Sequence, residues 1–194
     1  MKNSNSMTLA LASLMLTLPS VHANASELDA HEHGSANLDI AIDTSTIEMR
    51  FESPAVNIVG FEYATEDEQQ LLLINKAKSN LSNFDLIYGL VGDVSCQTVK
   101  SSAKWVTEHK AGHDDHDDHE AGHDDHGEVA KAEHAEFIAE YRLECNQLNN
   151  LAAIDVKMFE FFPAIEDLDV QVVYSQGQIK YELDANNTLI KLDR

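Results

Sequence analysis

The sequence predicts an α+β fold class: a single domain with a mostly antiparallel sheet, one or two helices and a disordered His-rich loop. Residues 36–52 and 137–145 alternate apolar and polar side chains, which is the pattern of half-buried β-strands. Residues 66–81 instead place apolar side chains at helical spacing. A polar insert at 108–133 separates two of the predicted strands, and its composition predicts disorder.

The first 25 residues predict a cleaved secretory signal peptide. Lys2 precedes an apolar run over 7–18, Pro19 interrupts the run, and Ala23 and Ala25 are the small residues typical of a cleavage site. The run is twelve residues long, whereas about 20 are needed to cross a bilayer. We therefore expect an exported mature protein, residues 26–194, with no membrane insertion.

The first half of the mature chain predicts a hairpin and a helix. Residues 36–52 form the hairpin, with a turn at Asp43 and Thr44, and Pro54 ends it. The apolar segment 55–63 fits either a strand or a tight crossing. Thr65 and Glu68 make a capping box, so the helix is expected over 66–81 with Thr65 as its N-cap.

The second half predicts strands on both sides of the insert. Residues 85–90 predict an element of undetermined type, and 94–106 fit a strand. Residues 137–145 fit a returning strand that pairs with it, which makes the insert the tip of a hairpin. Further strands are expected at 155–161, 168–174, 179–183 and 189–192, with turns at 175–177 and 185–187.

The two cysteines are expected to form a disulfide. Exported proteins usually pair an even number of cysteines, and Cys96 with Cys145 is the one intramolecular pairing possible. Such a bond would clamp the base of the excursion that carries the insert. The alternative is a pair of small buried thiols, which an oxidising compartment disfavours.

Net charge restricts the partners. The chain carries 34 acidic and 13 basic residues, for a net charge of −21, which becomes −22 when Lys2 leaves with the signal peptide. This balance argues against nucleic acid and anionic lipid as partners.

The insert has the composition of a metal-collecting segment. Residues 113–126 read HDDHDDHEAGHDDH, in which five histidines alternate with seven carboxylates. Neutral imidazole and carboxylate are ligands suited to Zn(II), Ni(II), Co(II) and Cu(II). The predicted ligands in and beside this tract are His109, His113, His116, His119, His123 and His126. Its glycines and aspartates disfavour a rigid cage, so we expect several weak sites.

A second group of histidines precedes the first predicted strand. His31 and His33 form an H-x-H pair, and on a strand both imidazoles would lie on one side. They could nucleate an ordered site completed by a carboxylate or by a tract histidine; the alternative is two solvated histidines in a frayed terminus. His134 flanks the insert, as His109 does, and each is either a ligand or a surface residue.

The segment His119-Glu120-Ala121-Gly122-His123 formally matches the H-E-x-x-H signature of zinc metalloproteases. In those enzymes the motif lies on a stable helix, so that both histidines face one zinc ion. Here the motif straddles two copies of a ten-residue repeat, contains a glycine and lacks an apolar stripe. We therefore expect no enzyme, and keep a zinc hydrolase as the alternative of another class.

Three segments of the chain resemble one protein family. They are residues 31–34 (HEHG), 52–62 (ESPAVNIVGFE) and 159–163 (FEFFP), together with an insert between two cysteine-bearing strands. The chain is similar to the zinc-regulated periplasmic proteins that assist a zinc ABC uptake system, the ZrgA-like family. The resemblance implies a periplasmic Zn(II)-binding protein working beside the transporter's solute-binding protein, with the metal role carried by His31, His33 and the tract. Sequestration of zinc or nickel against toxicity would use the same residues.

The absence of zinc-protease chemistry can be tested with one substitution. Glu120→Gln is expected to leave zinc binding unchanged, because the tract offers many other ligands, and wild-type protein is expected to cleave no peptide. Calorimetric zinc titration and digestion of a peptide library would check both. Zinc-dependent cleavage that disappears in Glu120→Gln would establish the hydrolase alternative.

Overall fold

The computed structural model describes residues 32–107 and 134–192. Its first half contains β1 (Ser35–Ile42), β2 (Thr46–Pro54), α1 (Val56–Val59), α2 (Glu68–Leu81), α3 (Phe84–Ile87), β3 (Tyr88–Gly92) and β4 (Ser95–Thr107). The second half contains β5 (Ala135–Asn146), η1 (Leu148–Asn150), β6 (Leu151–Val156), η2 (Met158–Glu160), β7 (Asp167–Tyr174), β8 (Gly177–Leu183) and β9 (Leu189–Lys191). The predicted α+β class is confirmed.

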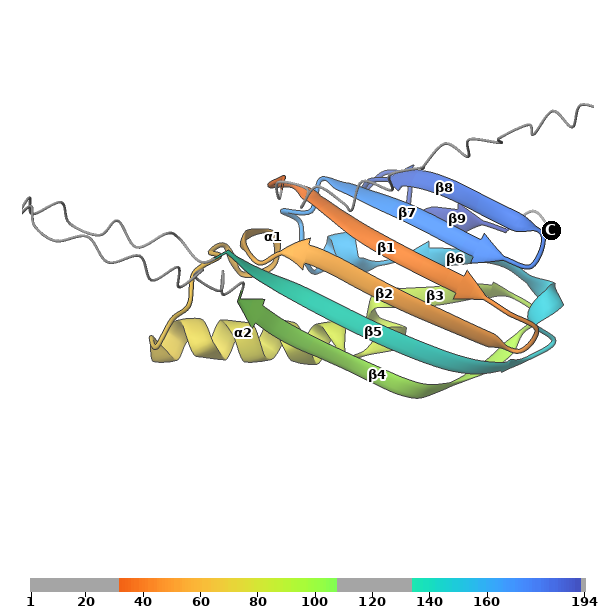
Figure 1. The fold of residues 1–194 in the computed structure, drawn as a ribbon, viewed down its shortest axis with the longest axis horizontal. Helices are drawn as coiled ribbons and strands as arrows, with labels where there is room; N and C mark the ends of the chain where they lie inside the picture. Colours follow the sequence, from red (N-terminus) through yellow and green to blue (C-terminus); the bar gives the residue numbers. More distant parts are fainter. Residues whose placement is uncertain (1–31, 108–133, 193–194) are drawn as a thin grey trace, which may run out of the picture. The chain divides into compact units, whose positions relative to one another are not determined.

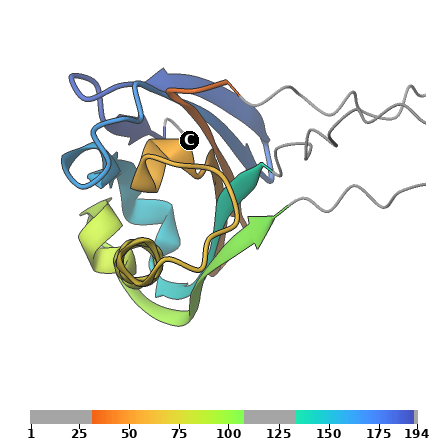
Figure 2. The same cartoon turned by 90° about the vertical axis from the view of Figure 1, so that its left-hand side faces the viewer.

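The strands form two sheets in two layers. A six-stranded sheet has the order β4-β5-β2-β1-β7-β8, and a three-stranded sheet has the order β3-β6-β9. All neighbouring strands are antiparallel except β1 and β7, which are parallel. One face of the larger sheet is covered by the helices at one end and by the smaller sheet at the other (Figures 1 and 2).

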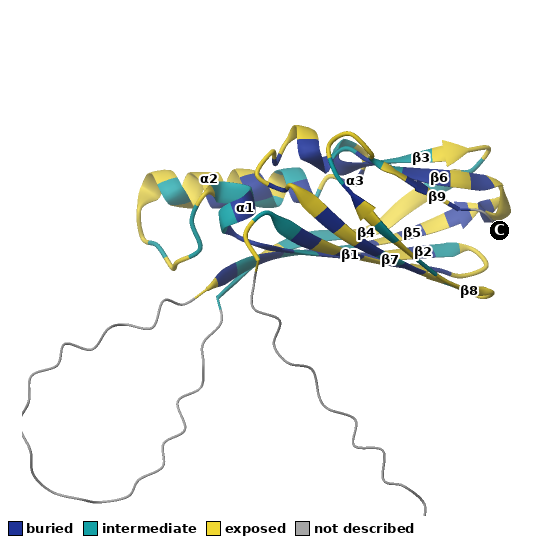
Figure 3. Ribbon diagram, turned by 90° about the horizontal axis from the view of Figure 1, so that it is seen from above, coloured by how far each residue is buried: buried dark blue, intermediate teal, exposed yellow. Residues whose placement is uncertain are grey.

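Alternating burial along the strands explains why the larger sheet has one covered face. Along β1 and β2, every second side chain is buried, and the residues between them are mostly exposed (Figure 3). The inward side chains from the central strands are Leu38, Ile40, Ile47, Met49, Phe51, Phe137, Tyr141 and Leu143, all at most 3 % exposed. The strand pattern found in the sequence is therefore the pattern of the core.

The segment after the hairpin is a helical turn. The predicted hairpin is confirmed as β1 and β2, but 55–63, for which a strand or a tight crossing was expected, contains α1. Gly60 ends this turn with φ 85°, a left-handed conformation that glycine adopts without strain, and its N–H donates to the Val56 carbonyl.

Helix α2 begins later than the capping-box prediction. Its N-cap is Asp67, whose carboxylate accepts hydrogen bonds from the N–H groups of Gln69 and Gln70. Thr65 lies outside the helix and accepts a hydrogen bond from the Asp67 N–H, so the predicted start at residue 66 is wrong. The Asp67 carboxylate also interacts favourably with the positive end of the helix dipole.

The remaining differences lie in short apolar stretches. Residues 85–90, for which one element of undetermined type was predicted, divide between α3 and β3. The strand expected at 155–161 is β6, at Leu151–Val156, and the aromatic run after it turns through η2. Phe159 and Phe162, three positions apart, are both buried, which is helical rather than strand spacing.

Strands β4 and β5 form the long hairpin that the sequence predicts around the insert. Their pairing runs from Thr107 opposite Ala135 to Ser95 opposite Asn146. Cys96 and Cys145 are a cross-strand pair joined by a disulfide. The bond lies at the end of the hairpin remote from the insert, so the insert's own root is closed by strand pairing.

Over the described ranges, no helix combines the length and apolar character that a membrane crossing requires.

Deleting residues 113–126 is expected to leave the domain folded. The hairpin on either side is fixed by its register and by the disulfide, and roughly halving the loop should stabilise the metal-free protein by about 0.6 kcal/mol. Thermal unfolding with and without the deletion, both in chelator, measures the difference. A collapse of the melting temperature would show that the tract has a structural role.

Candidate metal centre

One of the eight predicted metal-binding histidines, His33, belongs to the part of the chain that the structure describes. The other seven lie outside the described residues: His31, His109, His113, His116, His119, His123 and His126. His134, the flanking histidine that was left as either a ligand or a surface residue, is described. The site can therefore be built from His33 and His134 and from what surrounds them.

Four strand ends meet at one end of the six-stranded sheet. Here β1 begins at Ser35, β2 ends at Pro54, β4 ends at Thr107 and β5 begins at Ala135. Thr107 pairs with Ala135, and Pro54 pairs with Glu136 on the other side of β5. His33 lies two residues before β1 and His134 directly before β5, so the sheet register brings both to the end at which these two strands begin.

The carboxylate of Glu62 lies between the two histidines. Glu62 belongs to the connection between α1 and α2. Its Oε2 is 3.3 Å from Nε2 of His33, and its Oε1 is 3.1 Å from Nδ1 of His134. The Glu62 side chain is 22 % exposed, whereas those of His33 and His134 are 63 % and 50 % exposed. One half-buried acid thus contacts two accessible imidazoles from distant parts of the sequence.

A buried amide fixes the backbone next to His33. Asn57, in α1, is 4 % exposed. Its Oδ1 accepts a hydrogen bond from the Gly34 N–H at 2.8 Å, and its Nδ2 donates to the Ser35 carbonyl at 2.8 Å and to Ser53 Oγ at 3.3 Å. A single side chain therefore ties the start of β1 to the helical turn that leads to Glu62.

Main-chain hydrogen bonds hold Glu62 beside His134. The N–H of Ala135 donates to the Glu62 carbonyl at 2.9 Å, and the Ala135 carbonyl accepts from the Ala55 N–H at 2.8 Å. Because His134 directly precedes Ala135, these bonds place its side chain next to that of Glu62. The backbone positions of all three residues are set by the fold rather than by their side-chain contacts.

Aromatic side chains flank this acid. Phe61 and Tyr63, its neighbours in sequence, have ring centroids 5.3 Å apart. Phe61 also lies 5.8 Å from Trp105, which in turn meets Phe137 edge to face at 5.2 Å. This aromatic group joins Glu62 to the core at the end of the sheet where β4 finishes.

The donor set suits a borderline divalent metal. Two imidazole nitrogens and one carboxylate are ligands typical of zinc sites. Within 32–107 and 134–192, no group of three or more His, Cys, Asp or Glu side chains already stands ready to hold a metal ion. In the His33, Glu62 and His134 cluster each imidazole faces a different oxygen of the Glu62 carboxylate.

Sequence reasoning only partly anticipated this cluster. It predicts that a site at His31 and His33 is completed by a carboxylate or by a tract histidine, but it does not identify Glu62, and it permits either a ligand or a surface role for His134. The available signal was the position of Glu62 at the end of the segment 52–62 that carries the family resemblance. Contacts spanning 29 and 72 residues cannot be read from local spacing.

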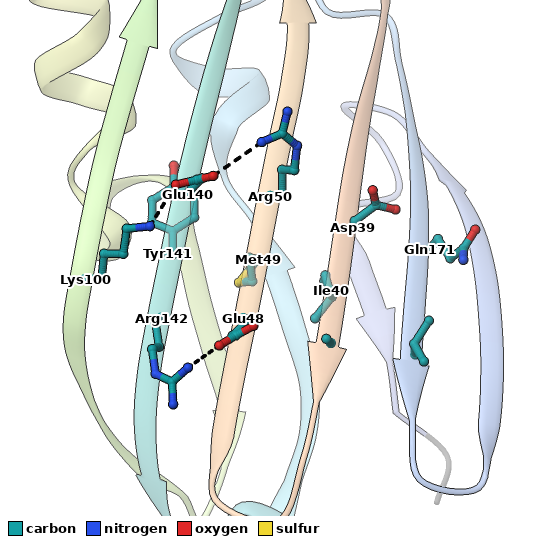
Figure 4. Close-up of a pocket in the computed structure, with 12 residues that line it drawn as sticks. Asp39, Ile40, Glu48, Met49, Arg50, Lys100, Glu140, Tyr141, Arg142 and Gln171 are labelled. Atoms are coloured by element: carbon teal, nitrogen blue, oxygen red, sulfur yellow. Dashed lines mark hydrogen bonds and ion pairs between the residues drawn. The ribbon is translucent and has the colours of Figure 1, made fainter. Parts of the chain in front are cut away.

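A second concave feature lies elsewhere, on the uncovered face of the sheet. It is a groove of about 560 Å³ whose charged lining comes mainly from β2, β4 and β5 (Figure 4). Glu140 lies between Lys100, at 2.8 Å, and Arg50, at 3.3 Å. The hydrogen bond and the positive charge of Lys100 lower the pKa of Glu140. No histidine or cysteine is among the described residues that line this groove.

Comparison with known proteins gives one family. The model of a family described as "ZrgA family zinc uptake protein" matches residues 30–192, which include every described strand and helix. No curated protein matches the chain.

Replacing the buried amide tests how the His33 backbone is held. Asn57→Ala is expected to lower the free energy of unfolding by about 1–3 kcal/mol, because the Gly34 N–H and the Ser35 carbonyl lose a buried partner. Asn75→Ala, at an exposed position of α2, is the matched control and should be neutral or slightly stabilising. Denaturant unfolding measures both. If Asn57→Ala is as stable as the control, the Asn57 side chain does not hold the backbone next to His33.

Proposed function

The chain belongs to the ZrgA family of zinc uptake proteins, and on that premise we propose that it is a periplasmic protein that collects Zn(II) and supports its uptake by an ABC transporter. Two parts share the work in this proposal. The His/Asp-rich tract gathers the ion, and an ordered site near His31 and His33 holds it.

The observation that carries the proposal is the contact between His33 and Glu62. A histidine predicted to bind metal lies 3.3 Å from a carboxylate at the end of the sheet where β4 and β5 open into the tract. Zinc gathered by a histidine of the tract would therefore enter next to a site whose ligand types suit it. This arrangement supports a collecting loop joined to a holding site.

The tract supplies many metal ligands but no fixed arrangement of them. Its histidines alternate with aspartates, which raise the local concentration of cations. Sites of this kind bind weakly and exchange quickly, because no rigid scaffold is implied by the composition. Such sites are suited to delivering an ion onward.

The location and the partner follow from the same proposal. The signal peptide expected at 1–25 would deliver the mature chain to the periplasm, where the solute-binding protein of a zinc ABC transporter would receive the ion. Membership of an uptake family favours this role over sequestration. The HEAGH segment adds no catalytic role in this proposal, and it lies outside the described residues.

Zinc titration of the mature protein is expected to show two classes of site. The tight class involves His31 or His33, and the weaker class comprises the tract between 109 and 126. Deleting 109–126 should remove the weak class and leave the tight class, as measured by calorimetry at constant pH. Replacing His31 and His33 together should do the reverse.

A single class of site that disappears with 109–126 would overturn the division of labour. No zinc binding by the intact chain would overturn the proposed function itself.

A further inference from the structure

We infer that His33, Glu62 and His134 together form a zinc site with three protein ligands and an exchangeable fourth position. The inference rests on the proposed function and makes it specific: it names the ligands that complete the His33 site and assigns that site to the transfer of the ion. The sequence predicted no metal role for Glu62, and for His134 it permitted either a ligand or a surface role.

The side chains already meet through their ligating atoms. Nε2 of His33 and Nδ1 of His134 face the two oxygens of the Glu62 carboxylate, at 3.3 and 3.1 Å. Each is a nitrogen through which an imidazole binds zinc in its neutral form. The ion would take over the position in which the carboxylate now joins the two rings.

Rotation of the two exposed histidine side chains would bring the three groups to one ion. The distance between His33 Nε2 and His134 Nδ1 is at most the sum of their two contact distances to Glu62 and the distance between the two Glu62 carboxylate oxygens. His33 and His134 are 63 % and 50 % exposed, so neither ring is confined by the core. Zinc–ligand distances of about 2.0–2.2 Å require the two rings to swing toward each other, around one ion.

The backbone under these side chains is preorganised. Gly34 accepts hydrogen bonds from the N–H groups of Glu166 at 2.7 Å and Asp167 at 3.1 Å, in addition to its bond to Asn57. On the other side, Ala135 donates to the Glu62 carbonyl. Three segments distant in sequence are thus fixed before any metal arrives, which reduces the entropy cost of binding.

The number of ligands argues for transfer rather than for a structural role. Structural zinc sites are closed by four protein ligands, whereas sites that must exchange a ligand keep one position open. Here the domain is already held by its core and by the Cys96–Cys145 disulfide, so the fold does not need the metal. Water would fill the fourth position at rest, and a ligating side chain of the receiving protein would displace it.

The test compares isosteric variants of the mature chain, residues 26–194. Glu62→Gln and His134→Gln are expected to weaken the tight class at least about 10-fold and to leave the weak class unchanged. Glu66→Gln, an exposed acid in the same connection, is the matched control and should bind like the wild type. Zn(II) calorimetry gives affinity and number of sites, and melting of the metal-free proteins shows that every variant is folded.

Cobalt(II) tests the open position. Adding imidazole to the Co(II)-loaded wild type should change its visible absorption bands, because imidazole replaces the bound water. The same addition should have no such effect on Glu62→Gln at a Co(II) level that fills the wild-type tight class.

The failures can be told apart. A wild type that binds no zinc overturns the proposed function. A tight class that is equal in the wild type, Glu62→Gln and His134→Gln overturns this assignment while zinc binding stands. If Glu66→Gln weakens zinc binding by the tight class as much as Glu62→Gln does, the effect is loss of negative charge and not loss of a ligand. If imidazole leaves the Co(II) absorption bands unchanged, the site has no open position.

Discussion

The register of the six-stranded sheet is the constraint on which the rest of this structure depends. Leu38, Phe51 and Ala139 stand in one row across β1, β2 and β5, all facing the second layer. A slip of one residue would turn such a row to solvent and bring charged neighbours such as Arg50 and Glu140 into the core. The same register aligns the ends of the strands, and this alignment gathers His33, Glu62 and His134 although they are far apart in sequence.

Carboxylates on this domain divide by the kind of partner they face. On the uncovered face of the sheet, Glu140 is neutralised by Lys100 and Arg50, and such a pair leaves little to attract a metal ion. Glu62 faces imidazoles instead. A neutral imidazole is itself a metal ligand, so the histidines around Glu62 add to its attraction for zinc where a lysine would oppose it. The partner of a carboxylate therefore says more than its charge about whether that carboxylate attracts a metal ion.

Local patterns in the sequence predicted the elements whose side chains repeat regularly. The hairpin over 36–52, the strand pair around the insert and the helix over 66–81 were all recognisable because burial follows a period of two or 3.6 residues. Short elements could not be predicted in this way. Apolar residues at 55–59 fit a strand equally well, and the choice of a helical turn depends on hydrogen bonds from Asn57 to the start of β1, which is distant in sequence. Pairing of β1 with β7 in parallel was likewise beyond any local signal.

The candidate site shows the same limit. The H-x-H pair directed attention to His33, because histidine spacing is a local signal. The second imidazole reaches it through the sheet register, and the acid through the main-chain hydrogen bond between Glu62 and Ala135. The start of α2 was misplaced for a related reason, since Thr65 and Asp67 both satisfy the N-cap preference and only the folded geometry distinguishes them.

The aromatic side chains beside Glu62 include an intrinsic fluorescent probe. Trp105 is the one tryptophan of the chain, and it lies 5.8 Å from Phe61, the residue before Glu62. Indole emission depends on the polarity and charge around the ring, so its intensity and wavelength report on this end of the sheet alone. Events at the tract's root can thus be followed in unlabelled protein, in real time, without a dye that would compete for the ion.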